Sequence, residues 1–330
     1  MMKYGWAGMA AALGMTAGMA SAQDAVTLQL KWVTQGQFAG YYVALDNGYY
    51  EEEGLDVTIR PGGPDIAPVQ VLMGGGADVM VDWMPSALAA REQGAPVVNI
   101  AQPVIRSGLM LVCWADAGIA TPEDFRGHKI GTWFFGNEIP LLNWLSQLGI
   151  PTTGGEDGAE ILRIGFNVDP LLQHQADCVT AMTYNEYWQV IDAGVTPEQI
   201  VVFRYEDYGV ATLEDGLWVN EANLSDPAFV DRMARFVRAS MRGWEWALAN
   251  PEAAAEMVLD HDETGAQTLE HQVRMVREMA ALTEGSTGVL DEAAYQRTVD
   301  TLLGGGSDPV ITRAPEGAFT HAVTDAASME

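Results

Sequence analysis

Short apolar runs alternate along this chain with segments in which apolar residues recur every three or four positions. The runs predict strands, and the three-to-four periodicity predicts helices. In the first third, strands are predicted at 26–32, 55–60, 78–81 and 97–102, and helices at 38–53, 66–73 and 85–93. This strand–helix alternation predicts an α/β fold with a mostly parallel sheet covered by helices.

A second α/β series follows a strand predicted at 109–114. Its strands are predicted at 129–133, 161–164, 178–182 and 200–205, and its helices at 138–148, 168–175 and 185–193. A strand at 217–220 then leads into helices at 226–249, 251–259, 264–282 and 292–303. The polar tail from Ala314 is predicted to be poorly ordered.

Two α/β units in succession predict two lobes with a cleft between them. We assign 23–108 together with 218–330 to the first lobe and 109–217 to the second. The crossings between the lobes, which would act as hinges, are predicted near 109–114 and 208–217.

The N-terminus has the pattern of an export signal. Lys3 is followed by an apolar run at 6–19 and by Ala20-Ser21-Ala22, a typical cleavage site. The run is too short for the ~20 apolar residues of a membrane span. We therefore predict a signal peptide at 1–22, cleavage after Ala22, a periplasmic mature protein and no membrane insertion after signal removal.

Composition excludes several classes of protein. The formal net charge is −28, and Lys3, Lys31 and Lys129 are the only lysines, which argues against a nucleic-acid partner. Hydrophobic residues make up 48%, enough for a large core. Cys113 and Cys178 would pair only if their strands were neighbours, and we favour two separate buried thiols.

Catalytic and metal-binding motifs are not found in the sequence, and no cofactor is expected. Acidic residues flank a histidine only in the segment 260–263 (DHDE), which we interpret as a solvated loop rather than a metal site.

Ligands of open α/β sheets bind beyond the carboxyl ends of the strands. This rule selects the loops 33–38, 82–85, 102–107, 134–138 and 183–186. The candidate ligand-binding residues in and beside these loops are mostly aromatic, amide or acidic: Trp32, Gln35, Gln37, Phe38, Tyr41, Asp82, Trp83, Gln102, Trp133, Phe134, Asn137, Glu138, Tyr184, Asn185 and Glu186.

Aromatic faces stack on flat rings, and amides or carboxylates bind ring-edge nitrogens. Arg106 is the only basic side chain in these loops, so a neutral or cationic heterocycle is favoured over an anion. Structural interpretations of some of these residues stay open. The tryptophans are equally compatible with a core position, Glu138 with a helix-dipole role, and Asp82 with helix capping.

The segments Lys31-Trp32, 40–44 (GYYVA) and 47–57 (NGYYEEEGLDV) resemble the opening of a family of periplasmic solute-binding proteins. That family includes binders of the thiamine pyrimidine precursor, aliphatic sulfonates and nitrate. The segments 76–78 (GAD) and 127–132 (GHKIGT) fit the same pattern. The resemblance implies a two-lobed, type II binding protein, which closes on a small ligand and delivers it to the permease and ATPase of an ABC importer.

The resemblance leaves the ligand open. A thiamine pyrimidine precursor is favoured and a riboflavin-like compound comes next, with a sulfonate or nitrate as the alternative. The fungal thiamine pyrimidine synthase belongs to the same wider family, so an enzyme is the second alternative. Its cysteine cluster and its lysine-plus-histidine site are missing here, and Phe38 stands where pyrimidine binders usually carry a histidine.

Overall fold

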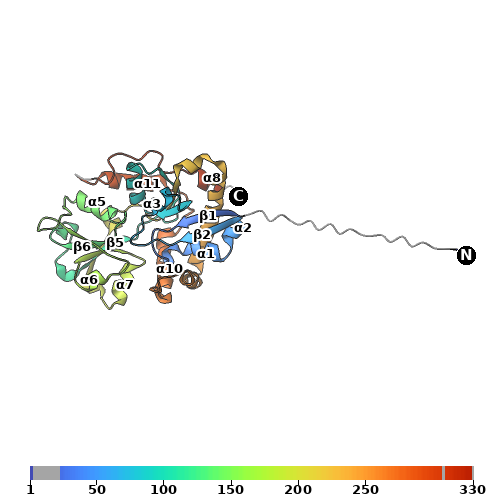
Figure 1. The fold of residues 1–330 in the computed structure, drawn as a ribbon. Helices are drawn as coiled ribbons and strands as arrows, with labels where there is room; N and C mark the ends of the chain where they lie inside the picture. Colours follow the sequence, from blue (N-terminus) through green and yellow to red (C-terminus); the bar gives the residue numbers. More distant parts are fainter. Residues whose placement is uncertain (3–22, 307–308, 329–330) are drawn as a thin grey trace.

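The computed structural model describes residues 1–2, 23–306 and 309–328. The predicted signal peptide, apart from its first two residues, lies outside this part of the chain. Figure 1 shows two lobes side by side, the second formed by the green-to-yellow middle of the chain and the first by the remainder. Among the described residues, no helix is long and apolar enough to cross a membrane.

The first lobe contains a five-stranded sheet in the order β2-β1-β3-β10-β4. Its strands are β1 (Asp24–Gln29), β2 (Leu55–Arg60), β3 (Val79–Asp82), β4 (Val97–Ala101) and β10 (Gly216–Asn220). β1 pairs in parallel with β2 and β3, whereas β10 is antiparallel to β3 and β4. The predicted mostly parallel sheet is confirmed, and its one antiparallel strand enters after the chain returns from the second lobe.

The second lobe repeats this plan with the order β7-β6-β8-β5-β9. Its strands are β5 (Leu109–Trp114), β6 (Lys129–Thr132), β7 (Glu160–Arg163), β8 (Cys178–Met182) and β9 (Ile200–Arg204). β5 is antiparallel to β8 and β9 and lies wholly within this sheet. The first crossing is therefore at 102–108, just before the predicted 109–114, and the second is at 209–215.

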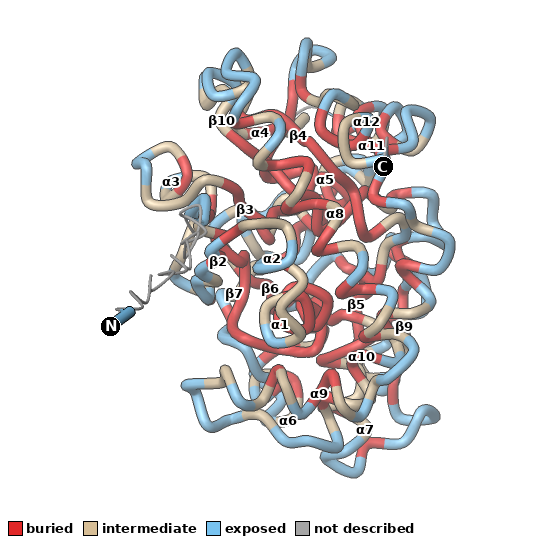
Figure 2. The backbone as a smooth tube through the Cα atoms, turned by 90° about the vertical axis from the view of Figure 1, so that its right-hand side faces the viewer, coloured by how far each residue is buried: buried red, intermediate tan, exposed pale blue. Residues whose placement is uncertain are grey.

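Helices cover both sheets, and Figure 2 shows the buried residues gathered along the strands and the inner helices. The helices of the first lobe are α1 (Ala39–Asp46), α2 (Tyr49–Glu52), α3 (Pro68–Met73), α4 (Met84–Glu92), α8 (Pro227–Ala249), α9 (Pro251–Asp260), α10 (Leu269–Thr283), α11 (Glu292–Leu303) and α12 (Ala322–Ser328). Those of the second are α5 (Ile139–Gln147), α6 (Asp169–Leu172) and α7 (Glu186–Asp192).

The motif glycine Gly40 allows α1 to pack closely against α8. A Cβ atom at Gly40 would lie 2.3 Å from the Trp244 ring, and one at Gly243 would lie 2.0 Å from the Gly40 carbonyl oxygen. Any side chain at either position would separate the two helices, which explains why glycine is needed in this part of the motif.

The C-terminal segment is ordered against the first lobe, which corrects the expectation of a loose tail. Ala318 and Val323 are buried. The Asn99 amide of β4 donates to the Ala318 carbonyl at 2.8 Å, and the Thr320 amide donates to the Asn99 carbonyl at 2.9 Å. These backbone hydrogen bonds and the few buried apolar side chains could not be predicted from the polar composition of the tail.

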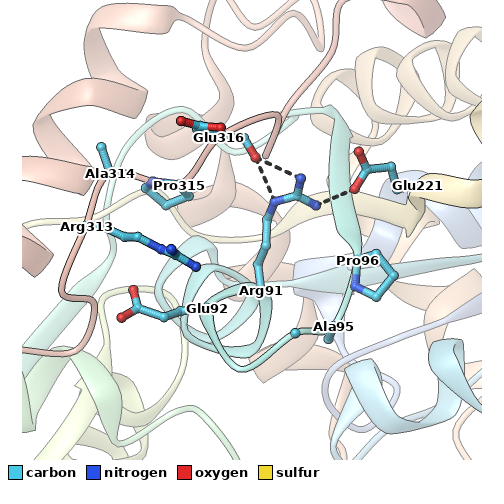
Figure 3. Close-up of a pocket in the computed structure, with 10 residues that line it drawn as sticks. Arg91, Glu92, Ala95, Pro96, Glu221, Arg313, Ala314, Pro315 and Glu316 are labelled. Atoms are coloured by element: carbon cyan, nitrogen blue, oxygen red, sulfur yellow. Dashed lines mark hydrogen bonds and ion pairs between the residues drawn. The ribbon is translucent and has the colours of Figure 1, made fainter.

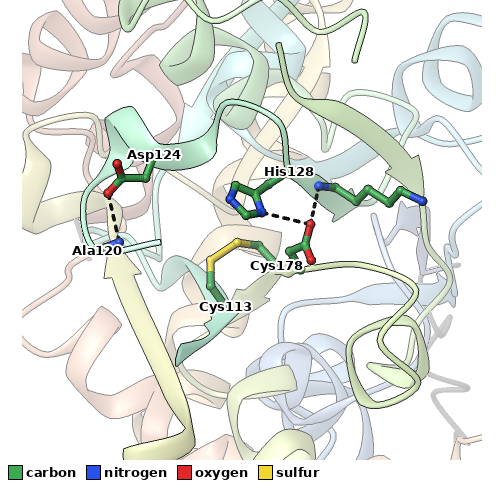
Figure 4. The surroundings of a disulfide bond; sticks show 7 residues. Cys113, Ala120, Asp124, His128 and Cys178 are labelled. Atoms are coloured by element: carbon green, nitrogen blue, oxygen red, sulfur yellow. Dashed lines mark hydrogen bonds and ion pairs between the residues drawn. A yellow bond between two sulfur atoms is a disulfide. The ribbon is translucent and has the colours of Figure 1, made fainter. Parts of the chain in front are cut away.

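Cys113 and Cys178 form a disulfide, so the expectation of two separate thiols is wrong (Figure 4). The two residues are direct register partners on the antiparallel strands β5 and β8, with Cα atoms 4.0 Å apart. Pairing depends on this register, which the spacing along the sequence does not reveal.

Reduction of this disulfide is expected to destabilise the protein. The cysteines are 65 residues apart, and chain-entropy arguments assign about 4 kcal/mol to a loop of roughly that length. Urea unfolding with and without dithiothreitol measures the change. The variant Cys113→Ala/Cys178→Ala should unfold at lower urea than the oxidised protein and should not respond to dithiothreitol. An unchanged midpoint of the wild-type protein under reduction would contradict the disulfide.

Candidate functional site

A narrow cavity lies between the two lobes. Its empty space, including the open solvent at its mouth, is about 270 Å³. The lining residues of the first lobe are Lys31, Trp32, Gln37 and Trp83, and those of the second are Trp133, Asn137, Met182, Tyr184 and Glu186. The cavity is therefore compact and bounded by both lobes.

The tryptophans reach the cavity because each follows the carboxyl end of a strand. Trp32 comes shortly after β1, Trp83 directly after β3, and Trp133 directly after β6. The Trp133 ring makes edge contacts with both others, with ring centroids 5.7 Å from Trp32 and 6.4 Å from Trp83. The aromatic residues that follow three strands, from both lobes, thus meet at one cavity, as expected from the rule that ligands bind beyond strand ends.

Lys31 places a positive charge inside this aromatic cavity. Its Nζ lies 3.4 Å from the centroid of the Trp83 ring and donates a hydrogen bond to Asn137 Oδ1 of the other lobe. Burial lowers the pKa of Lys31, while the neighbouring carboxyls of Asp82 and Asp215 oppose that effect. The ammonium thus connects the lobes and contacts an indole face.

Four buried carboxyl groups lie in and around the cavity: Asp82, Glu186, Glu214 and Asp215. Burial raises the pKa of Glu186 to about 7, that of Glu214 to about 8 and that of Asp215 to about 6. Burial also raises the pKa of Asp82, against the effect of Lys31.

Hydrogen bonds hold these carboxyls unequally. Asp82 Oδ1 accepts from Ser86 Oγ at 2.6 Å and from the Trp83 amide at 2.8 Å. Glu186 accepts from the Met182 amide at 3.0 Å. Asp215 Oδ1 is buried and has no hydrogen-bond partner within the described part of the chain.

Glu214 ties the two crossings together. Its carboxyl, on the segment 209–215, accepts from Ser107 Oγ at 2.6 Å and from the Gly108 amide at 3.0 Å, both on the segment 102–108. Gln102 Nε2 of the same segment donates to the Glu214 carbonyl at 2.7 Å. The hinge region is therefore a hydrogen-bonded unit that adjoins the cavity.

A second contact between the lobes runs through Asn185. Its Nδ2 donates to Gln35 Oε1 at 3.4 Å, and its Oδ1 accepts from His271 Nε2 on α10 at 2.8 Å. Burial lowers the pKa of His271, which favours the neutral ring. These contacts join the two lobes beside Glu186, a residue of the cavity wall.

The structure brings together about half of the residues that the sequence singled out. The cavity is lined by Trp32, Gln37, Trp83, Trp133, Asn137, Tyr184 and Glu186. Gln35, Asp82 and Asn185 are buried next to it, through the contacts just described.

The other candidates lie outside the lining. Phe38 is fully buried in the core, and Tyr41 packs edge-on against Trp244 with ring centroids 5.8 Å apart. Gln102 belongs to the hinge. Phe134 is half-buried and contributes its carbonyl oxygen to Asn137 Nδ2, and Glu138 precedes α5 and accepts from the Gly136 amide.

Five residues in or around the cavity were not among the binding candidates predicted from the sequence: Lys31, Met182, Glu214, Asp215 and His271. An adjacent acidic pair directly before an apolar strand was the available signal for Glu214 and Asp215. Nothing local indicated His271, because it reaches Asn185 from a helix of the other lobe. The described residues hold no cluster of three potential metal ligands, and in the segment 260–263 His261 pairs with Asp46.

A roomier depression, with an empty space of about 830 Å³, lies on the first lobe (Figure 3). Two basic residues, Arg91 and Arg313, line this depression. Arg91 binds Glu221 at 2.9 Å and the Glu316 carbonyl oxygen at 2.8 Å. Because the Arg91 charge is already paired within the protein, and no strand-end candidate lines the depression, the cleft between the lobes is the better candidate site.

Comparison with known proteins gives a family and several relatives. A family model described as NMT1/THI5 like matches residues 35–254. The formylaminopyrimidine-binding protein of Halalkalibacterium halodurans is 27% identical, with 87% of each chain covered. The riboflavin-binding protein RibY of Chloroflexus aurantiacus is 28% identical, over 75% of this chain and 70% of its own. A 4-amino-5-hydroxymethyl-2-methylpyrimidine phosphate synthase of Legionella pneumophila is 27% identical, over 73% and 74%.

Solved structures identify the fold. A Bordetella bronchiseptica protein superposes with a TM-score of 0.68 at 18% identity, over 92% of this chain and 97% of its own. The periplasmic aliphatic sulphonate-binding protein SsuA of Escherichia coli gives 0.58 at 14% identity, over 84% and 85%. The predicted two-lobed periplasmic-binding-protein fold is confirmed.

The buried carboxyls predict a pH-dependent stability. The pKa of Glu214 is raised from 4.5 to about 8, so the folded state holds its proton more tightly than the unfolded state does. This stabilisation is complete below the ordinary pKa and is lost as the pH rises through about 8. Glu214→Gln imitates the protonated group. Between low and high pH, the free energy of unfolding of this variant should therefore decrease by at least ~1 kcal/mol less than that of the wild type.

Urea unfolding at a series of pH values from about 5 to 9 measures this difference. Glu263→Gln removes the same formal charge from an exposed loop and is the control. Superimposable pH profiles for wild type and Glu214→Gln would show that Glu214 is not held protonated by the fold.

Proposed function

This chain belongs to the NMT1/THI5 like family, and we propose that it is the solute-binding component of an ABC importer for a small heteroaromatic compound. The observation that carries the proposal is the cavity lined by Trp32, Trp83 and Trp133 between two lobes. Aromatic walls from both lobes suit a flat ring, which would be enclosed when the lobes close.

A pyrimidine related to the thiamine precursor is the favoured ligand, and a riboflavin-like compound is second. The relatives named for formylaminopyrimidine and riboflavin binding support this choice of ring chemistry. The buried carboxyls of Asp82, Glu186 and Asp215 oppose a sulfonate or nitrate.

We place the mature protein, beginning at Gln23, in the periplasm, where it would deliver the ligand to the permease and ATPase of the importer. Two features support this placement. The sequence at 1–22 has the signal pattern, and the Cys113–Cys178 disulfide requires an oxidising compartment to persist.

An enzyme remains the alternative because relatives of similar identity are pyrimidine phosphate synthases. The buried amine of Lys31 in the cavity wall is the observation that favours it. No step is derived for such an activity, since the lysine-plus-histidine pair of the fungal enzyme is missing from the sequence.

Calorimetry with a panel of compounds tests the ligand class. We expect heat from a 2-methyl-4-aminopyrimidine, weaker or no heat from riboflavin, and none from taurine or nitrate. Heat from taurine or nitrate alone would overturn the heteroaromatic proposal and leave the importer role intact. Pyridoxal phosphate belongs in the panel, because a stoichiometric imine absorbance at Lys31 would favour the enzyme instead.

Stacking in the cavity predicts a specific effect of one tryptophan. Trp133→Ala should weaken binding of the panel's best ligand by ~1–3 kcal/mol, the scale of aromatic stacking on a base. Fluorescence quenching by that ligand should also decrease, since Trp133 lies in the cavity wall. Trp246→Ala on α8, outside the cavity, is the control. Equal affinity of the two variants would remove Trp133 from the site.

A further inference from the structure

The Lys31 ammonium occupies a position that suits an organic cation. It lies 3.4 Å from the Trp83 ring centroid, while Trp32, Trp133 and Tyr184 line the same cavity. Indole faces attract cations, and the attraction grows when the cation is removed from water. Lys31 is only 4% exposed, so the cavity already holds one desolvated positive charge.

The charges around this position are not balanced. Of the described residues, Lys31 is the only buried lysine or arginine, whereas Asp82, Glu186 and Asp215 are buried carboxyls. Glu214 is also buried, but the fold favours its protonated, neutral form. Asp82, Asp215 and Glu214 each act on the Lys31 ammonium. A buried carboxylate is stabilised by a partner of opposite charge, and Asp215 Oδ1 has no hydrogen-bond partner within the described chain.

The cavity also contains a donor without an acceptor. The Trp133 Nε1–H group is buried and has no hydrogen-bond partner within the described chain. A buried donor that stays unpaired costs free energy, which a ligand atom with a lone pair would recover. Trp133 comes from the second lobe and Trp83 from the first, so one ligand could satisfy both walls.

We propose that the ligand is an organic cation with a hydrogen-bond acceptor, that its charged nitrogen binds over the Trp83 face, and that Lys31 is a tethered competitor displaced from this face. The inference rests on the proposed function and narrows it to positively charged heteroaromatic rings. Displacement of Lys31 also breaks its hydrogen bond to Asn137 of the other lobe. The bound ligand would then contact both lobes in place of this bond.

Two matched probes test the charge requirement. The permanent cation is 4-amino-1,2-dimethylpyrimidinium, and the neutral ring is 4-amino-2-methylpyrimidine at pH 8. Wild-type protein should bind the cation about tenfold more tightly, corresponding to ~1.4 kcal/mol. Equal or tighter binding of the neutral ring would overturn this inference and leave the proposed function standing. Binding of neither ring would overturn both.

Lys31→Met tests the competition. This variant lacks the tethered charge and should bind the cationic probe about tenfold more tightly than the wild type does. A change of that size lies within the range of a desolvated cation–π contact. The affinity for the neutral probe should change less. Lys31→Arg keeps the charge and should stay close to wild type. Lys129→Met, at an exposed position on β6, is the matched control for losing a lysine.

Loss of affinity for both probes in Lys31→Met, with an unchanged unfolding midpoint, would identify Lys31 as a donor to the ligand and would overturn the competitor role. A gain in cation affinity in Lys31→Arg equal to that in Lys31→Met would likewise overturn it, because charge would then not be the cause.

Discussion

The burial of charge between the two lobes is the constraint on which the rest of this structure depends. A lysine and several carboxyls lose most of their contact with water at the cleft, and desolvation of each group is costly. The fold offsets that cost with specific partners. Asp82 accepts hydrogen bonds from the start of α4. Glu186 accepts from the end of β8 and from the loop that follows it, and Glu214 accepts from the opposite crossing. The lobes, the hinge and the cavity are therefore parts of one electrostatic arrangement.

Strand periodicity predicted the fold and led to the three tryptophans that line the candidate cavity. Trp32, Trp83 and Trp133 were found because parallel strands end at the same edge of a sheet, a rule that needs no knowledge of the distance between lobes. Tyr184 and Glu186 were found in the same way, after β8. Residues such as Phe38 and Tyr41 were selected by proximity to these loops, but a helix turns most of its side chains away from the strand end.

The remaining features depend on tertiary register, which a single sequence does not contain. Glu214 and Asp215 lie in a segment that crosses between the lobes, not in a loop after a parallel strand. The rule that ligands bind beyond strand ends therefore did not predict them. The Cys113–Cys178 bond requires β5 to be antiparallel to β8 and aligned residue for residue. Likewise, the segment after Ala314 contains few apolar residues, and its order comes from backbone pairing with β4. In each case the deciding partner is distant along the chain.

The position of the chain ends has a practical consequence. At the start of the described segment 23–306, Asp24 pairs with Arg235 of α8, and in the described segment 309–328 α12 packs on the same helix. Residues 24 and 322–328 thus belong to the first lobe, and the second lobe is topologically an insertion between the segments 102–108 and 209–215. A dye attached at residue 24 or within 322–328 reports on the first lobe alone. Joining the ends and opening the chain in a second-lobe loop would give a circular permutant, in which a label at the new ends follows the other lobe.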